Sequence, residues 1–128
     1  MPSPSVENAG PVAPVDRARV EAVLSSLASR LPAAARSVPG QILFRLTGPD
    51  VDFAIRTDDD GARLAPPDRD PAGPPLIEVV GDAATVCAVL TGERDARRQF
   101  FEGGFRVRGN LRHMSDLALE LGLISTPL

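Results

Sequence analysis

Few side chains in this sequence could carry out catalysis or bind a metal. His113 is the only histidine, Cys87 is the only cysteine, and the chain has neither tyrosine nor tryptophan. One histidine and one cysteine cannot supply the four ligands of a zinc site built from these two residue types. The two could form a nucleophilic pair, but Cys87 falls on the apolar stripe of its predicted helix, where a small buried hydrophobe is expected. An enzyme that uses Cys87 would need this thiol to be exposed and reactive.

Three consecutive carboxylates, at Asp58, Asp59 and Asp60, allow a calcium site as one interpretation. The EF-hand pattern needs an acidic ligand at the end of its loop, and Arg69 occupies that position instead. Gly61 follows the aspartates, and Asp-Gly is a strong hairpin signal, so a turn is favoured. The chain also lacks the glycine-rich phosphate-binding loops of nucleotide-binding proteins. We therefore expect no catalytic residues, no metal and no cofactor, and a protein that is not an enzyme.

The composition indicates a single folded domain. The chain has 128 residues, of which 43% are hydrophobic, and a net charge of −3, which argues against general affinity for nucleic acid. A single cysteine excludes an intrachain disulfide. No apolar run is long enough to cross a bilayer, and the N-terminus lacks the pattern of a secretory signal. These observations predict a cytoplasmic protein with one domain over residues 15–124.

The first part of the chain is predicted to contain one helix and then strands. Residues 1–14 are rich in proline and are expected to form a disordered tail. Asp16 begins a helix with an apolar stripe at helical spacing, formed by Val20, Val23, Leu24, Leu27, Ala28 and Leu31. Alternating apolar and polar residues predict strands at 41–47, 51–56, 62–65 and 76–80. The proline-rich loop at 66–75 is long enough to be mobile or functional.

Residues 81–121 are predicted to form two helices, a strand and a last helix. Asp82, Asp95 and Asn110 can each cap a helix, and a glycine follows the end of each helix. The strand covers 105–108, where apolar and basic residues alternate. The last helix has an apolar side formed by Leu111, Met114, Leu117, Ala118 and Leu121. Strands gather early and helices late, which predicts an α+β fold with about five strands in a largely antiparallel sheet.

The turns, the paired aromatic residues and the helix caps of this second part follow a pattern that is similar to that of a known family. Its elements are Leu90-Thr91-Gly92, Phe100-Phe101, Gly103-Gly104, the strand at 105–108 and Gly109-Asn110. This stretch resembles the C-terminal half of the sterol carrier protein 2 family of non-specific lipid-transfer proteins, although Asn110 stands where an aspartate is usual. The resemblance implies a five-stranded sheet covered by helices that encloses an apolar tunnel. It also implies non-catalytic binding and transfer of a fatty acid, a fatty acyl-CoA or a sterol-like lipid.

The resemblance and the predicted faces together suggest which side chains would form the tunnel wall. These are Phe44, Phe53, Ile55, Val79, Val86, Leu90, Phe100, Phe101, Phe105, Val107, Met114, Leu117 and Leu121. Hydrophobic periodicity alone cannot separate a tunnel from an ordinary core, because both use the same residue types. The alternative is an interaction or accessory module of the same fold, with a filled core, that dimerises or docks on a partner enzyme. A continuous apolar pocket of roughly several hundred Å³ would favour the lipid carrier over the module.

Five arginines cluster around the last predicted strand, at Arg97, Arg98, Arg106, Arg108 and Arg112. One interpretation is a set of solvated salt bridges, and the other is contact with acidic lipid headgroups at the mouth of the tunnel. The expected partners are therefore a hydrophobic small molecule and, transiently, a membrane surface. Nucleic acid is not an expected partner, and the protein is expected to be a monomer or a weak homodimer.

Overall fold

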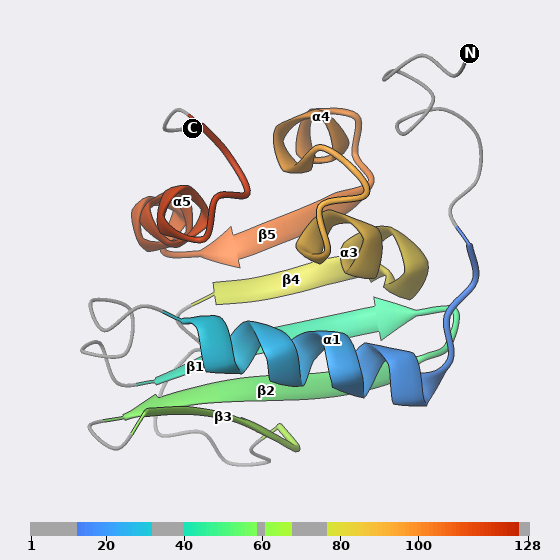
Figure 1. Ribbon diagram of the computed structural model, residues 1–128, viewed down its shortest axis with the longest axis horizontal. Coiled ribbons are helices and arrows are strands. Elements are labelled where there is room, and N and C mark those ends of the chain that lie inside the picture. The colour runs from blue at the N-terminus through green and yellow to red at the C-terminus, as the bar shows by residue number, and fades with distance from the viewer. Residues whose placement is uncertain (1–12, 32–39, 59–60, 68–76, 126–128) are drawn as a thin grey trace.

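Helices cover one face of a five-stranded sheet in the computed structural model, which describes residues 13–31, 40–58, 61–67 and 77–125 (Figure 1). The elements are α1 (Arg17–Arg30), β1 (Gly40–Thr47), β2 (Val51–Asp58), β3 (Gly61–Ala65), β4 (Ile77–Asp82), α3 (Ala83–Leu90), α4 (Ala96–Phe101), β5 (Phe105–Gly109) and α5 (Leu111–Glu120). The predicted α+β class is confirmed. Most of the predicted tail, most of the proline-rich loop and the side chains of the three aspartates lie outside the described residues.

The strands follow the order β3-β2-β1-β4-β5 across the sheet. Three of the neighbouring pairs are antiparallel, and β1 and β4 form the one parallel pair. The largely antiparallel sheet is therefore confirmed, as is the interior position of β4, between β1 and β5. β5 is an edge strand, and α4 and α5 lie on either side of it in the chain (Figure 1).

The strand register places apolar side chains in rows on the face that the helices cover. Phe44 of β1 pairs with Phe53 of β2 and with Val79 of β4, and Val79 pairs with Val107 of β5. Directly paired residues in neighbouring strands point to the same face. These side chains therefore form a row across four strands, and this row is the floor on which the helices pack.

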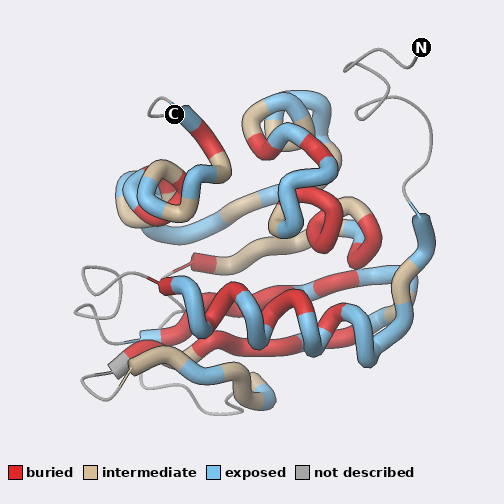
Figure 2. The backbone as a smooth tube through the Cα atoms, viewed as in Figure 1, coloured by how far each residue is buried: buried red, intermediate tan, exposed pale blue. Residues whose placement is uncertain are grey.

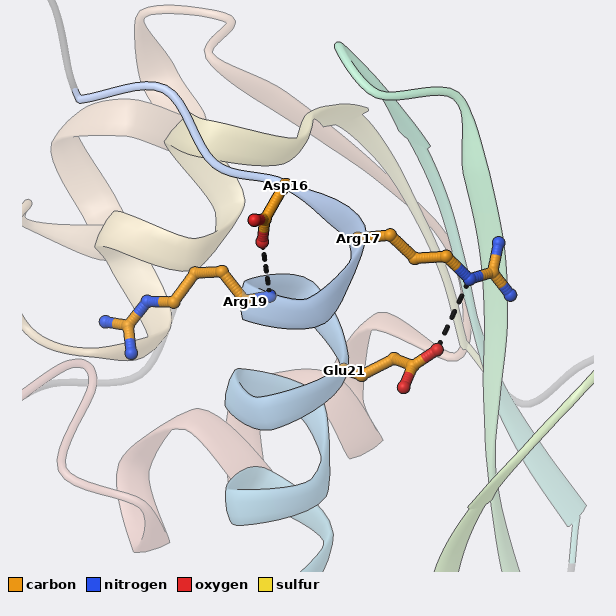
Figure 3. A network of polar contacts seen from close by, with 4 residues as sticks. All are labelled: Asp16, Arg17, Arg19 and Glu21. Atoms are coloured by element: carbon orange, nitrogen blue, oxygen red, sulfur yellow. Dashed lines mark hydrogen bonds and ion pairs between the residues drawn. The ribbon is translucent and has the colours of Figure 1, made fainter.

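The first helix, α1, packs on the sheet through its predicted stripe. Asp16 caps it by accepting a hydrogen bond from the backbone N–H of Arg19 at 2.8 Å, and Arg17 pairs with Glu21 across one exposed turn at 3.3 Å (Figure 3). Val20 and Leu24 are fully buried. Figure 2 shows buried and exposed residues alternating along α1, as expected for a helix with one buried side. The apolar stripe is therefore a core face of the domain.

The three later helices begin at the predicted caps. In each, the capping side chain accepts a hydrogen bond from the backbone N–H three residues later, at distances of 3.1, 2.9 and 3.0 Å for Asp82, Asp95 and Asn110. The predicted apolar side of α5 is wrong at Leu111, which is 52% exposed. Leu111 starts α5 at the open edge of the molecule, where the preceding Gly109 and Asn110 are also exposed.

The last helix ends in a turn that directs the chain back toward the core. The N–H of Leu123 donates to the carbonyl of Ala118 at 2.9 Å, and the N–H of Gly122 donates to the carbonyl of Leu119 at 3.1 Å. This pair of bonds is a Schellman motif, and it requires the positive φ of 76° that Gly122 adopts. Ile124 is consequently buried against Val89 and Ala118.

Candidate functional site

A partly open apolar pocket lies between the sheet, the three later helices and the end of α1, which contributes Leu27 and Leu31. Its cavity has a volume of about 110 Å³, and twenty of the described residues line it. Nineteen of them are apolar, and Arg97 is the one charged residue among those described. Such a site can exclude water and hold hydrocarbon, but its described wall offers no set of groups for acid–base or nucleophilic chemistry.

The sheet supplies the floor of the pocket through β1, β4 and β5. Phe44, Val79 and Val107 come from one paired row, and Ile42 and Ile77 come from the next pair of positions. The parallel pairing of β1 with β4 matters here, because it places the β1 row directly beside the β4 row. These five side chains are phenylalanine, valine or isoleucine, which are strand-forming residue types, and together they give a continuous apolar surface that faces the helices.

The helices supply the walls and the rim. Val86 and Leu90 project from α3, Phe100 comes from α4, and Met114 and Leu117 come from α5. The ring centroid of Phe100 lies 5.8 Å from that of Phe105, at an interplanar angle of 51°. This aromatic contact joins α4 to the start of β5, so the wall on this side is made by two elements that depend on each other.

Ten of the thirteen predicted wall residues line this pocket. They are Phe44, Val79, Val86, Leu90, Phe100, Phe105, Val107, Met114, Leu117 and Leu121. The register of the strands and the caps of the helices bring them together from six elements. Their contact with a lipid stays a prediction.

Three predicted wall residues do not line the pocket. Phe53 and Ile55 lie on β2, on the same helix-covered face as the pocket but in the part that α1 covers, and they are closely packed in the main core. The guanidinium carbon of Arg17 lies 5.0 Å from the centroid of the Phe53 ring, so Arg17 covers this ring. Phe101 lies outside the pocket, and 70% of it is exposed. Its neighbour Phe100 takes the inward position, since consecutive residues of a helix point in different directions.

Sequence reasoning missed ten residues that line the pocket. They are Leu27, Leu31, Ile42, Ile77, Val89, Ala96, Arg97, Ala118, Leu123 and Ile124. Ile42 and Ile77 share faces with predicted wall residues and could have been found by that signal. Leu123 and Ile124 gave no periodic signal, because the turn at Gly122 places them.

Cys87 lies under a second hollow, of about 320 Å³, between α3 and the segment that leads into α1. The lining of this hollow is mixed and includes the charged residues Asp16, Arg19 and Glu93, so it suits a hydrocarbon chain less well than the apolar pocket does. Cys87 is only 3% exposed, and burial raises the pKa of its thiol. Arg19 opposes this rise in the pKa, whereas Asp82 and Glu93 add to it. These properties are those of an inert buried cysteine and not of a nucleophile.

Glu78 lies on the other face of the sheet, away from the pocket. Its carboxylate is 3.5 Å from Arg45 and 3.9 Å from Arg108, and the side chain is 15% exposed. Arg45 and Arg108 therefore form structural ion pairs with Glu78. This agrees with the salt-bridge interpretation for Arg108. Arg98 likewise pairs with Glu102 at 3.0 Å.

Solved structures with similar folds identify the architecture. The UbiJ-SCP2 ubiquinone synthesis protein superposes with a TM-score of 0.58 and 18% identity, over 83% of this chain and 92% of that chain. Sterol carrier protein 2 from Yarrowia lipolytica superposes with a TM-score of 0.51 and 17% identity, over 84% of this chain and 80% of that chain. The chain has the sterol carrier protein 2 fold. A comparison of the sequence with protein-family models found no match, and a comparison with curated proteins found none either.

The sterol carrier protein 2 fold also occurs as a part of a larger enzyme. The stereoselective inverting sec-alkylsulfatase Pisa1 from Pseudomonas sp. matches 77% of this chain, with a TM-score of 0.57 and 14% identity, but the match spans only 15% of that chain. The fold by itself is therefore found both in small proteins and within an enzyme.

Membrane-spanning helices and metal-binding clusters are both absent from the described ranges of the chain. None of the helices in these ranges combines the length and the apolar character that crossing a bilayer requires. No group of three or more histidine, cysteine, aspartate or glutamate side chains in the same ranges is placed to hold a metal ion. The described part of the chain therefore leaves the apolar pocket as the main candidate site.

Proposed function

We propose that this protein binds a hydrophobic ligand in the apolar pocket and transfers it without chemical change. The ligand class is a fatty acid, a fatty acyl-CoA or a sterol-like lipid. The observation that carries the proposal is the lining of the pocket, in which nineteen of twenty described residues are apolar. The sterol carrier protein 2 fold adds support, because one similar structure is itself a sterol carrier protein.

Apolar burial is enough to drive such binding. Each buried methylene is worth about 0.8 kcal/mol, so an acyl chain of a dozen carbons offers on the order of 10 kcal/mol before the ordering of the chain is counted. No polar machinery is needed for this affinity. Exchange requires only that the wall can part, and the bound lipid leaves unchanged.

The pocket must widen when it binds a lipid. Its volume of about 110 Å³ is below the roughly 300 Å³ at which ligand pockets usually begin. The walls differ in how closely they are packed. Phe44 and Val86 are buried, whereas Val107, Met114 and Leu121 are only half-buried. We therefore assign the widening to the side formed by β5 and α5, where fewer contacts must be broken.

Native mass spectrometry of the purified protein, followed by extraction and identification of bound lipid, tests this function. A stoichiometric acyl or sterol-like species would support the carrier and identify its ligand class. A protein that is empty, and that also fails to take up a fluorescent fatty acid, would overturn the proposal.

The second candidate is a non-catalytic accessory module, and the small volume of the cavity favours it. In this case the core is effectively filled, and the protein acts by docking on an enzyme. The similarity of this chain to a segment of a larger enzyme adds support. The fatty-acid uptake measurement separates the two candidates, because a module with a filled core takes up no lipid.

A further inference from the structure

The large hydrophobic side chains that are exposed in the described residues both lie at the β5 edge of the molecule. Phe101 ends α4 and is 70% exposed, and Leu111 begins α5 and is 52% exposed. In the sequence they flank β5, which forms the edge of the sheet opposite β3 (Figure 1). Single exposed hydrophobic residues are normal on a protein surface, so these two acquire a meaning only together with the charge of the segment that carries them.

The same segment is positively charged within an acidic protein. Residues 95–113 contain five arginines and two acidic residues, a net charge of +3, whereas the whole chain has a net charge of −3. The remainder of the chain therefore has a net charge of −6. Arg106 and Arg112 are both exposed. A charge asymmetry of this size orients the molecule toward an anionic surface.

The edge is also joined to the wall of the apolar pocket. The rings of Phe101 and Phe100 make an edge contact, with their centroids 5.6 Å apart and an interplanar angle of 64°. Phe100 lines the pocket, and Phe101 does not. A surface that covers Phe101 would therefore lie directly beside the rim of the cavity.

We propose that the segment 95–113 docks on the surface of an anionic lipid membrane, with Phe101 and Leu111 entering the interface and the exposed Arg106 and Arg112 meeting the headgroups. Two separate apolar side chains among basic residues fit this occupant, because interfacial binding combines shallow apolar anchors with basic charge. A protein partner would more commonly be met by one continuous apolar patch. Docking at this edge would bring the rim of the lipid-binding pocket close to the membrane. The proposal therefore extends the proposed function but does not depend on it.

Binding of the full chain to vesicles tests the proposal without any bound ligand. One set of vesicles contains phosphatidylcholine and phosphatidylglycerol, and the other contains phosphatidylcholine alone. The exposed positive charge of this segment predicts a preference of at least about tenfold for the anionic vesicles, which raised salt should remove. Equal binding to both sets of vesicles, or no binding, would overturn the proposal.

Two kinds of variant locate the surface. Phe101→Ala should weaken vesicle binding by about tenfold, because the anchor is lost from an exposed position where folding does not depend on it. The pair Arg106→Gln and Arg112→Gln should weaken binding further than the pair Arg17→Gln and Arg19→Gln, which changes the net charge equally but lies on α1. Equal losses from the two pairs would show a general charge effect and would overturn the assignment to this edge.

Two controls separate this proposal from its rivals. Phe101→Ala should leave the uptake of a fluorescent fatty acid from solution unchanged, because Phe101 is not part of the pocket wall. Failure of the pocket and failure of the docking surface are thus measured independently. If Phe101→Ala abolishes a dimer seen by sedimentation and leaves vesicle binding intact, the edge is a self-association surface and the membrane proposal is wrong.

Discussion

Ala118 offers a test of whether the pocket is an open cavity or a filled core. It lies on α5, is 9% exposed and lines the pocket. Ala118→Leu adds three carbon groups at the cavity wall. At about 0.8 kcal/mol each, their burial would stabilise the folded state by up to about 2.4 kcal/mol if the cavity accepts them. In a close-packed core the same change costs about 1–3 kcal/mol through overpacking.

Ala28→Leu is the matched control for this substitution. Ala28 also lies within a helix, is 7% exposed and packs in the main core, but it does not line the pocket. We expect Ala28→Leu to lower the free energy of unfolding, measured by urea denaturation, and Ala118→Leu to raise it. The two substitutions share the same change in side chain and in helix propensity, so the sign of the difference reports the cavity alone.

Ligand binding should change in the opposite direction from stability. The added leucine occupies space that about three methylenes of a ligand would fill, so the affinity for a fluorescent fatty acid should fall on the order of 50-fold in Ala118→Leu. Ala28→Leu should leave this affinity nearly unchanged wherever the protein stays folded. If Ala118→Leu destabilises the protein as much as Ala28→Leu does, the cavity is not available, and the accessory module becomes the better account.

Three further substitutions test the wall, the rim and the buried thiol. Gly81→Ala should lower the free energy of unfolding by about 1–3 kcal/mol in urea, because its Cβ would lie 2.9 Å from the Cβ of Phe105; an unchanged stability would contradict the close packing of β4 and β5. Arg97→Met should weaken the binding of a fatty acid about fivefold while leaving its methyl ester unaffected, as expected for one partly exposed charge at the rim, and equal losses for both ligands would exclude an ionic role. Burial raises the pKa of the Cys87 thiol, so the unfolded thiol ionises first and stability should fall as the pH rises above the ordinary thiol value. Cys87→Ala should remove this part of the pH dependence, and an identical profile in both proteins would show that Cys87 makes no such contribution.

Local signals in the sequence were sufficient for most of the fold. Asp82, Asp95 and Asn110 act over three residues, so their caps could be predicted without knowledge of the tertiary structure. The alternation in β1 and β2 predicted which side chains face the helices. The parallel pairing of β1 with β4 could not be predicted in this way, because it depends on how the chain crosses the sheet between β3 and β4.

The pocket was harder to predict, because its wall and the core share residue types. Phe44 and Phe53 are neighbours on one face of the sheet, yet Phe44 lines the pocket and Phe53 lies under α1. Hydrophobic periodicity identifies the face of the sheet to which a side chain points, but it does not identify the helix that covers that side chain. Phe101 shows the same limit at a helix end, where the rotation of the last turn decides between Phe100 and Phe101.

The looser side of the pocket and the proposed docking edge are the same part of the molecule. Val107, Met114 and Leu121 are half-buried, whereas the residues that α1 covers are almost fully buried (Figure 2). A ligand that widens the cavity would therefore displace β5 or α5 before it disturbs the main core. Phe101 and Leu111 lie next to these two elements. Contact with a lipid surface and opening of the pocket would then act on the same elements, so a lipid could pass between bilayer and cavity with little exposure to water.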